Sequence, residues 1–175
     1  PKFSRRLELS RTSQAVATSF REAEGFALGV REFNGVFPAY GLHFNSADKK
    51  QYTLFADLPD VNGVANHVYD LTDANPIDGK PDELVDTYTI SLIPTLKGFC
   101  VGRKSSSINS CYNDTAIGAL DAVFIRPNPD VFITANGATY SDAEIFLELP
   151  TGECREVVIW QTGQLSIEPT CEALP

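Results

Sequence analysis

The sequence predicts an α+β fold, in which a long N-terminal amphipathic helix packs on an antiparallel, β-sandwich-like head. Two observations support this prediction. Apolar residues recur at helical spacing over the first thirty or so residues, and short alternating segments separated by turn residues fill the remainder. A chain of 175 residues is long enough to bury a core, so we expect one domain over 1–175. Within it, 1–33 is the helical spine and 34–175 is the β-rich head.

The helix is predicted to run from Arg5 to Glu32. No proline interrupts this stretch, and Gly25 and Gly29 are its weakest points. A stripe of apolar residues follows one helical face, at Leu9, Val16, Phe20, Ala23, Ala27 and Val30. We expect this narrow stripe to be buried against the strand-rich remainder.

The composition is that of an ordinary globular protein, with 43% hydrophobic and 21% charged residues. The net charge is −9, yet residues 1–31 carry six basic and three acidic side chains, so the rest of the chain is strongly acidic. This balance argues against nonspecific binding to nucleic acids or anionic membranes. The sequence has no run of 18 or more apolar residues, so none of its segments is expected to span a bilayer.

The head is predicted to contain nine strands, at Tyr40–Phe44, Tyr52–Asp57, Asp86–Leu92, Gly98–Gly102, Ala122–Arg126, Val131–Thr134, Ala143–Leu149, Glu153–Trp160 and Gln164–Thr170. The stretch from Val157 to Trp160 is apolar at every position, which indicates a central strand buried on both faces.

Four cysteines without C-x-x-C spacing suit disulfides better than a zinc site: Cys100, Cys111, Cys154 and Cys171. A two-residue turn at Thr162-Gly163 would place Cys154 directly opposite Cys171 in the last hairpin, at a site where side chains approach closely. Cys100 and Cys111 then pair by elimination. The alternative is four buried free thiols. Two disulfides would indicate an oxidising compartment outside the cytoplasm.

Residues 57–86 are predicted to form a long acidic loop, with eight acidic residues and one lysine. Compact domains seldom contain so long a loop without a purpose. Five oxygen-bearing side chains could gather around calcium, the one cofactor that the sequence raises: Asp57, Asp60, Asn62, Asn66 and Asp70. Their spacing does not match an EF-hand, so a solvated acidic loop is the favoured interpretation and no cofactor is expected.

The sequence shows no catalytic constellation. His43 and His67 are its only histidines, and neither has a cysteine or carboxylate at metal-ligand spacing. Nucleophile-elbow, Walker and Rossmann motifs are missing too. We therefore expect a protein that is not an enzyme and has no catalytic residues.

Several segments, taken in order, resemble the minor pseudopilins of bacterial type II secretion, the FimT/GspH-like group of type IV pilin-like proteins. The likeness covers about residues 10–167 and is carried by SFREAEGFALGVRE (19–32), FPAYGLHF (37–44), YTLFAD (52–57), VFIRPNPD (123–130) and WQTGQLSI (160–167).

The resemblance implies a pilin-like, non-catalytic structural subunit of a type II secretion or type IV pilus-like filament. The prepilin peptidase site and the apolar first half of the helix do not occur in this sequence, which fits removal of an anchoring segment. In the full-length form that segment would hold the protein in the inner membrane, with the head in the periplasm or at the cell surface. The expected partners are other pilin or pseudopilin subunits, contacted through Phe3, Leu7, Leu9 and Val16.

Two alternatives stay open. A secreted β-domain could bind calcium or another ligand through the acidic loop 57–86. A minor pilin that takes up DNA would need clustered basic residues on its head, and only Arg103-Lys104 qualifies, so nucleic acid is not an expected partner.

Overall fold

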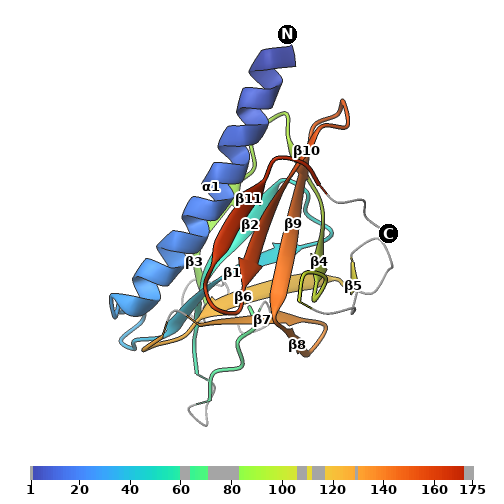
Figure 1. Cartoon of the computed structure of the whole chain (residues 1–175). Coiled ribbons are helices and arrows are strands. Elements are labelled where there is room, and N and C mark those ends of the chain that lie inside the picture. The colour runs from blue at the N-terminus through green and yellow to red at the C-terminus, as the bar shows by residue number, and fades with distance from the viewer. Residues whose placement is uncertain are drawn as a thin grey trace.

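The computed structural model describes residues 2–59, 64–70, 83–105, 110–111, 117–128 and 130–171. Within them the chain is mostly β, with one helix followed by eleven strands in two antiparallel sheets (Figure 1). The predicted α+β class is therefore wrong, although the expected β-sandwich-like arrangement of strands is present. The helix forms no layer of its own, because its buried side chains join the core that lies between the two sheets.

The strands of the six-stranded sheet are, in spatial order, β3 (Leu84–Thr89), β2 (Gln51–Asp57), β1 (Ala39–Asn45), β6 (Ala119–Phe124), β7 (Val131–Ala135) and β8 (Ala138–Tyr140). Those of the five-stranded sheet are β11 (Leu165–Glu168), β10 (Cys154–Trp160), β9 (Asp142–Glu148), β4 (Thr95–Val101) and β5 (Ser110–Cys111). All nine predicted strands are present, with ends shifted by up to three residues, and the short strands β5 and β8 are additional.

Helix α1 spans Lys2–Leu28 and ends four residues before the predicted end. Val30 has a left-handed backbone (φ 55°), its N–H bonds to the carbonyl of Ala27, and the N–H of Arg31 bonds to the carbonyl of Phe26. This pattern is a Schellman cap, in which glycine usually occupies the position that Val30 takes here. As a result Val30 leaves the predicted stripe and is 47% exposed.

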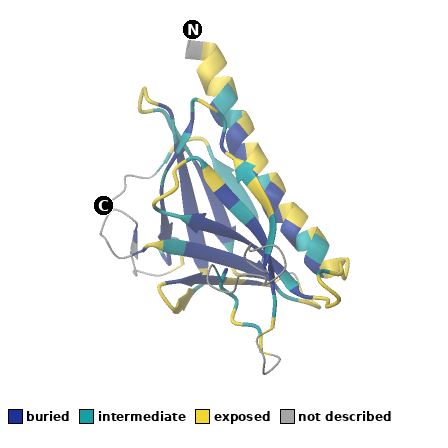
Figure 2. Ribbon diagram, turned by 180° about the vertical axis from the view of Figure 1, so that it is seen from behind, coloured by how far each residue is buried: buried dark blue, intermediate teal, exposed yellow. Residues whose placement is uncertain are grey.

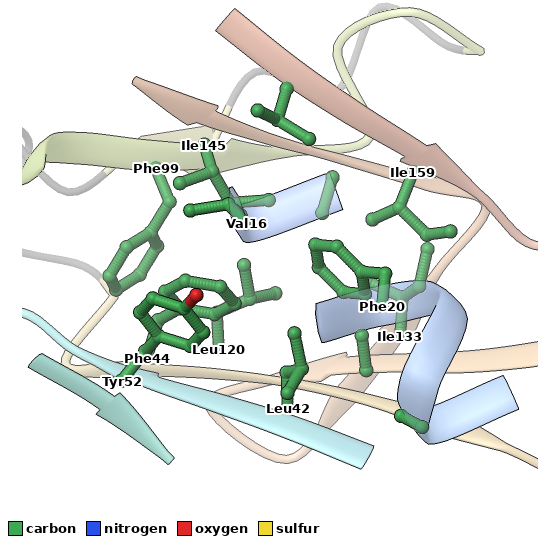
Figure 3. Close-up of a cluster of buried hydrophobic side chains, with 14 of the residues drawn as sticks. Val16, Phe20, Leu42, Phe44, Tyr52, Phe99, Leu120, Ile133, Ile145 and Ile159 are labelled. Carbon is green, nitrogen blue, oxygen red and sulfur yellow. The ribbon is translucent and has the colours of Figure 1, made fainter. Parts of the chain in front are cut away.

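The core lies between the sheets and is closed along one side by α1, whose inner face is buried while its outer face is exposed (Figure 2). The remaining members of the predicted stripe are all buried: Leu9, Val16, Phe20, Ala23 and Ala27. Phe20 lies between the sheets, above Leu42 of β1 and close to Ile159 of β10 (Figure 3). Its ring centroid is 6.0 Å from that of Phe44. Burial of these side chains fixes the helix to the head.

The last hairpin has a three-residue turn and not the predicted turn of two. Ile159 faces Leu165, and Gly163 adopts a positive φ of 77° inside the turn, where its N–H bonds to the carbonyl of Trp160. The register is therefore shifted by one residue from the predicted one. Cys154 and Cys171 do not face each other in this ladder, because the paired residues end at Glu168.

Both predicted disulfide pairs are nevertheless present, and the described cysteines include no free thiol. Cys100 and Cys111 are facing residues of β4 and β5, with Cα atoms 4.0 Å apart. Cys171 reaches Cys154 through a bend at residues 169–170, and their Cα atoms are 5.6 Å apart. All four half-cystines pack around Phe146, on the face of the five-stranded sheet that points away from the core.

Candidate interaction surface

Helix α1 is held along both of its borders as well as through its buried stripe. Polar contacts join it to separate parts of the head: Glu22 with Tyr88, Glu8 with Ser91, Ser19 with Tyr52, Arg6 with Glu153, and Arg21 with the Gly163 carbonyl. Burial and the nearby Glu22 carboxylate raise the pKa of Tyr88, so its hydroxyl remains a donor. The Arg6–Glu153 pair is exposed and contributes little, so the buried stripe supplies most of the attachment.

The N-terminal end of the helix extends beyond the sheets and is exposed (Figures 1 and 2). Of the four predicted contact residues, Phe3 is 79% exposed and Leu7 is 41% exposed. Leu9 and Val16 are only 3% and 1% exposed. These two side chains are therefore not exposed as expected, because both lie in the core of their own head.

A groove of about 480 Å³ lies between the first half of α1 and the end of β3. Its helix side includes Leu7, Arg11 and Ala15, and its opposite side includes Thr89 and Ser91. The groove continues the exposed surface of Leu7 along the helix, so an incoming chain could contact both at once.

A second concavity, here called the helix-end hollow, lies at the C-terminal end of α1. Its volume is about 640 Å³, and its lining is mainly apolar: Leu28, Val30, Phe37, Pro38, Ala39, Asp57, Pro59, Ala65, His67, Ile125, Arg126 and Pro127. Three of these apolar side chains are well exposed, with Phe37 at 51%, Val30 at 47% and Leu28 at 42%. Exposed apolar clusters of this kind are typical of protein contact sites.

Asp57 supplies the polar wall of this hollow together with His67. The buried Asp57 carboxylate accepts a hydrogen bond from the His67 backbone N–H at 3.1 Å and lies 2.6 Å from its ring Nδ1. Burial raises the pKa of Asp57, and the hydrogen bond from His67 opposes that rise. The His67 ring also lies 4.5 Å, centroid to centroid, from Phe132 of β7. These contacts fix the hollow in shape.

Two further carboxyl groups hold residues 64–70 against the outer face of the six-stranded sheet. Glu83 accepts the backbone N–H groups of Leu58 (3.0 Å) and Asp70 (2.8 Å), and burial raises the pKa of Glu83 to about 7. Asp121 accepts the N–H of Tyr69 at 3.3 Å. Glu83 and Asp121 thus each bind a backbone N–H group of this segment.

His43 is the partner of Asp121 across the sheet. The two residues face each other on β1 and β6, and the distance from His43 Nδ1 to Asp121 Oδ1 is 2.8 Å. Burial raises the pKa of Asp121. Sequence reasoning missed both histidine–aspartate pairs. The sequence did carry a signal for one member of the His43–Asp121 pair. His43, like Gly41 and Asn45, occupies alternate positions of β1, and the side chains at these positions point away from the core.

Of the five predicted calcium ligands, the structure describes Asp57, Asn66 and Asp70, and each of these side chains is hydrogen-bonded within the protein. Asp60 and Asn62 lie outside the described residues. Asp57 is bonded to His67, while the Asn66 amide donates to Asp70 at 2.8 Å. Across the described ranges, no cluster of three or more His, Cys, Asp or Glu side chains is arranged to hold a metal ion.

Arg103 and Lys104, the basic pair of the DNA-binding alternative, are engaged with buried glutamates. Arg103 Nε lies 3.1 Å from Glu144, and Lys104 Nζ lies 3.1 Å from Glu156. Burial and the nearby Glu156 raise the pKa of Glu144 to about 7, although Arg103 opposes this rise. The two basic side chains therefore attach their own segment to the sheet and form no exposed basic patch.

No known protein family, no curated protein and no solved structure matches this chain. Among the described residues, no helix has the length and apolar character needed to cross a membrane.

Proposed function

We propose that this protein is a non-catalytic structural subunit of an extracytoplasmic filament of the type II secretion or type IV pilus kind. One observation carries the proposal. The inner face of the helix is buried in the head from Leu9 to Ala27, whereas Phe3 and Leu7 are exposed on the part of the helix that projects beyond the sheets. Apolar side chains on a rigid projecting rod are suited to packing against another protein, because their burial is favourable only when a partner covers them.

Two disulfides are compatible with a location outside the cytoplasm. The proposal adds an inner-membrane anchor, formed by an apolar helical segment that precedes Lys2 in the full-length protein. Reading the codons upstream of Pro1 tests this part directly. About twenty apolar codons that continue the helix would support it, and an ordinary cleavable signal peptide would contradict it.

The charged residues of the head support a structural role. Each histidine is paired with a buried aspartate, and Glu83 binds two backbone N–H groups. The calcium-binding alternative makes a different prediction for these residues. If the acidic region bound calcium in the folded state, added calcium would raise the melting temperature of the protein.

Filament assembly is tested with single substitutions in the full-length protein, expressed in the organism that naturally produces it. Phe3→Glu places a charge where the proposal requires burial. We expect roughly tenfold or greater loss of the protein from sheared filaments, since burying a phenylalanine contributes about 1.5–3 kcal/mol. The melting temperature of the head should not change, because Phe3 is 79% exposed.

The matched control is Leu92→Glu. Leu92 is 94% exposed, lies between β3 and β4, and lines neither the groove beside Leu7 nor the helix-end hollow. This variant should enter filaments at the wild-type level. The proposal is wrong if Phe3→Glu also enters filaments normally, or if the wild-type protein never appears in a filament fraction.

A further inference from the structure

We propose that, within the filament, the exposed Phe3 and Leu7 side chains of α1 in one copy pack against the helix-end hollow of the next copy. This inference rests on the proposed function and adds the receiving surface. The two surfaces are chemically matched, since Phe3 and Leu7 are exposed apolar residues and the hollow exposes Leu28, Val30 and Phe37.

The hollow is built before any partner arrives. Arg126 donates a hydrogen bond to the Phe37 carbonyl, and the Tyr40 hydroxyl donates one to the Arg31 carbonyl at 3.0 Å. The Asp57–His67 pair fixes the opposite wall. A preformed site loses little side-chain entropy when a partner binds. This low entropic cost favours binding through a contact that is small in area.

Val30 is the strongest sign that this surface is used. It is a β-branched residue in the left-handed region (φ 55°), at a cap position where glycine would relieve the strain. Its side chain is 47% exposed and lines the hollow. The chain thus keeps a strained and exposed apolar side chain at the rim, which is typical of a functional position.

The occupant must come from another molecule. A helix of 27 residues is about 40 Å long, so Phe3 cannot reach the hollow at the far end of its own helix. A contact between two different surfaces of identical copies is heterologous, and such contacts propagate into filaments when the rotation between copies does not close a ring.

The small contact area points to a copy held in the same filament. An aromatic side chain buries about 150–250 Å², so Phe3 and Leu7 fall well short of the roughly 1,000 Å² of a stable binary interface. A freely diffusing partner would dissociate quickly. A neighbour already held in the filament binds again because its effective concentration is high.

The test places a photo-crosslinking amino acid at Phe3 of the full-length protein in assembled filaments, followed by mass spectrometry of the linked peptides. We expect links to peptides that contain residues 28–39 or 125–127. The crosslinker at Leu92, 94% exposed and outside both surfaces, should give no such link.

Two substitutions in the receiving copy sharpen the test. Phe37→Asp should reduce the Phe3 link roughly tenfold or more by placing a charge in the hollow, and Leu92→Asp should leave it unchanged. Val30→Gly should reduce the link while raising the melting temperature, because glycine relieves the left-handed strain. A weakened link in a more stable protein cannot be attributed to poor folding.

The outcomes separate the two proposals. Links from Phe3 to a neighbouring copy at other peptides would overturn the hollow as the receiving surface and leave the filament function standing. If no position on the exposed half of α1 links to another copy in any filament fraction, both proposals are wrong.

Discussion

Removal of the Phe20 side chain tests whether α1 is part of the folded head. Phe20 is fully buried between the two sheets, with its ring 6.0 Å from that of Phe44. Phe20→Ala removes this contact and leaves a cavity, so it should lower the free energy of unfolding by about 3–5 kcal/mol. Native domains have only about 5–15 kcal/mol in total, so the effect will be large.

The matched control is Thr18→Ala, on the exposed face of the same helix. Its hydroxyl bonds only to the Gln14 carbonyl of its own helix at 2.8 Å, so the change should stay within about 0.5 kcal/mol. Urea unfolding is followed by Trp160 fluorescence, which reports on β10, and by circular dichroism of the helix. The reasoning fails if Phe20→Ala lowers stability by less than about 1 kcal/mol, or if the helix signal is lost before the Trp160 signal.

Three further variants test the head. Cys154→Ser with Cys171→Ser should lower the free energy of unfolding by about 3 kcal/mol in urea titrations, and an unchanged midpoint would contradict this. Gly41→Ala should destabilise by about 1–3 kcal/mol, because the added Cβ would lie 2.7 Å from the Ala122 carbonyl oxygen; a wild-type melting temperature would show that the strands adjust freely. Burial raises the pKa of Glu83 from 4.5 to about 7, so its contribution to stability is complete below pH 4.5 and is lost as the pH rises through about 7. Glu83→Gln should flatten that part of the stability–pH curve, and an unaltered slope would assign the effect to other groups.

Local periodicity predicted the elements that can be recognised without knowing which segments they pack against. The stripe from Leu9 to Ala27 is buried as expected because helical spacing alone determines which side chains share a face. The fold class was missed because the sequence does not reveal that this helix would share one core with both sheets. Val30 was misplaced because its left-handed cap depends on hydrogen bonds from residues beyond the helix.

Long-range pairing was predictable only where chemistry limits the choices. The disulfide partners were correct because four cysteines allow few combinations, although the turn at Gly163 shifts the hairpin by one residue. The His43–Asp121 pair joins residues 78 positions apart, and nothing in either local sequence indicates the other. The helix-end hollow was missed for the same reason, since its walls come from distant segments that meet only in the fold.

The attachment of α1 has a mechanical consequence. Its buried stripe runs parallel to the helix axis and contacts strands of both sheets, from Leu9 to Ala27. A pull applied along the axis at the N-terminal end loads all of these contacts in shear, so they must give way together. A sideways pull would peel them apart one after another. Tension transmitted lengthwise through the rod therefore meets the head in the direction in which it resists most strongly.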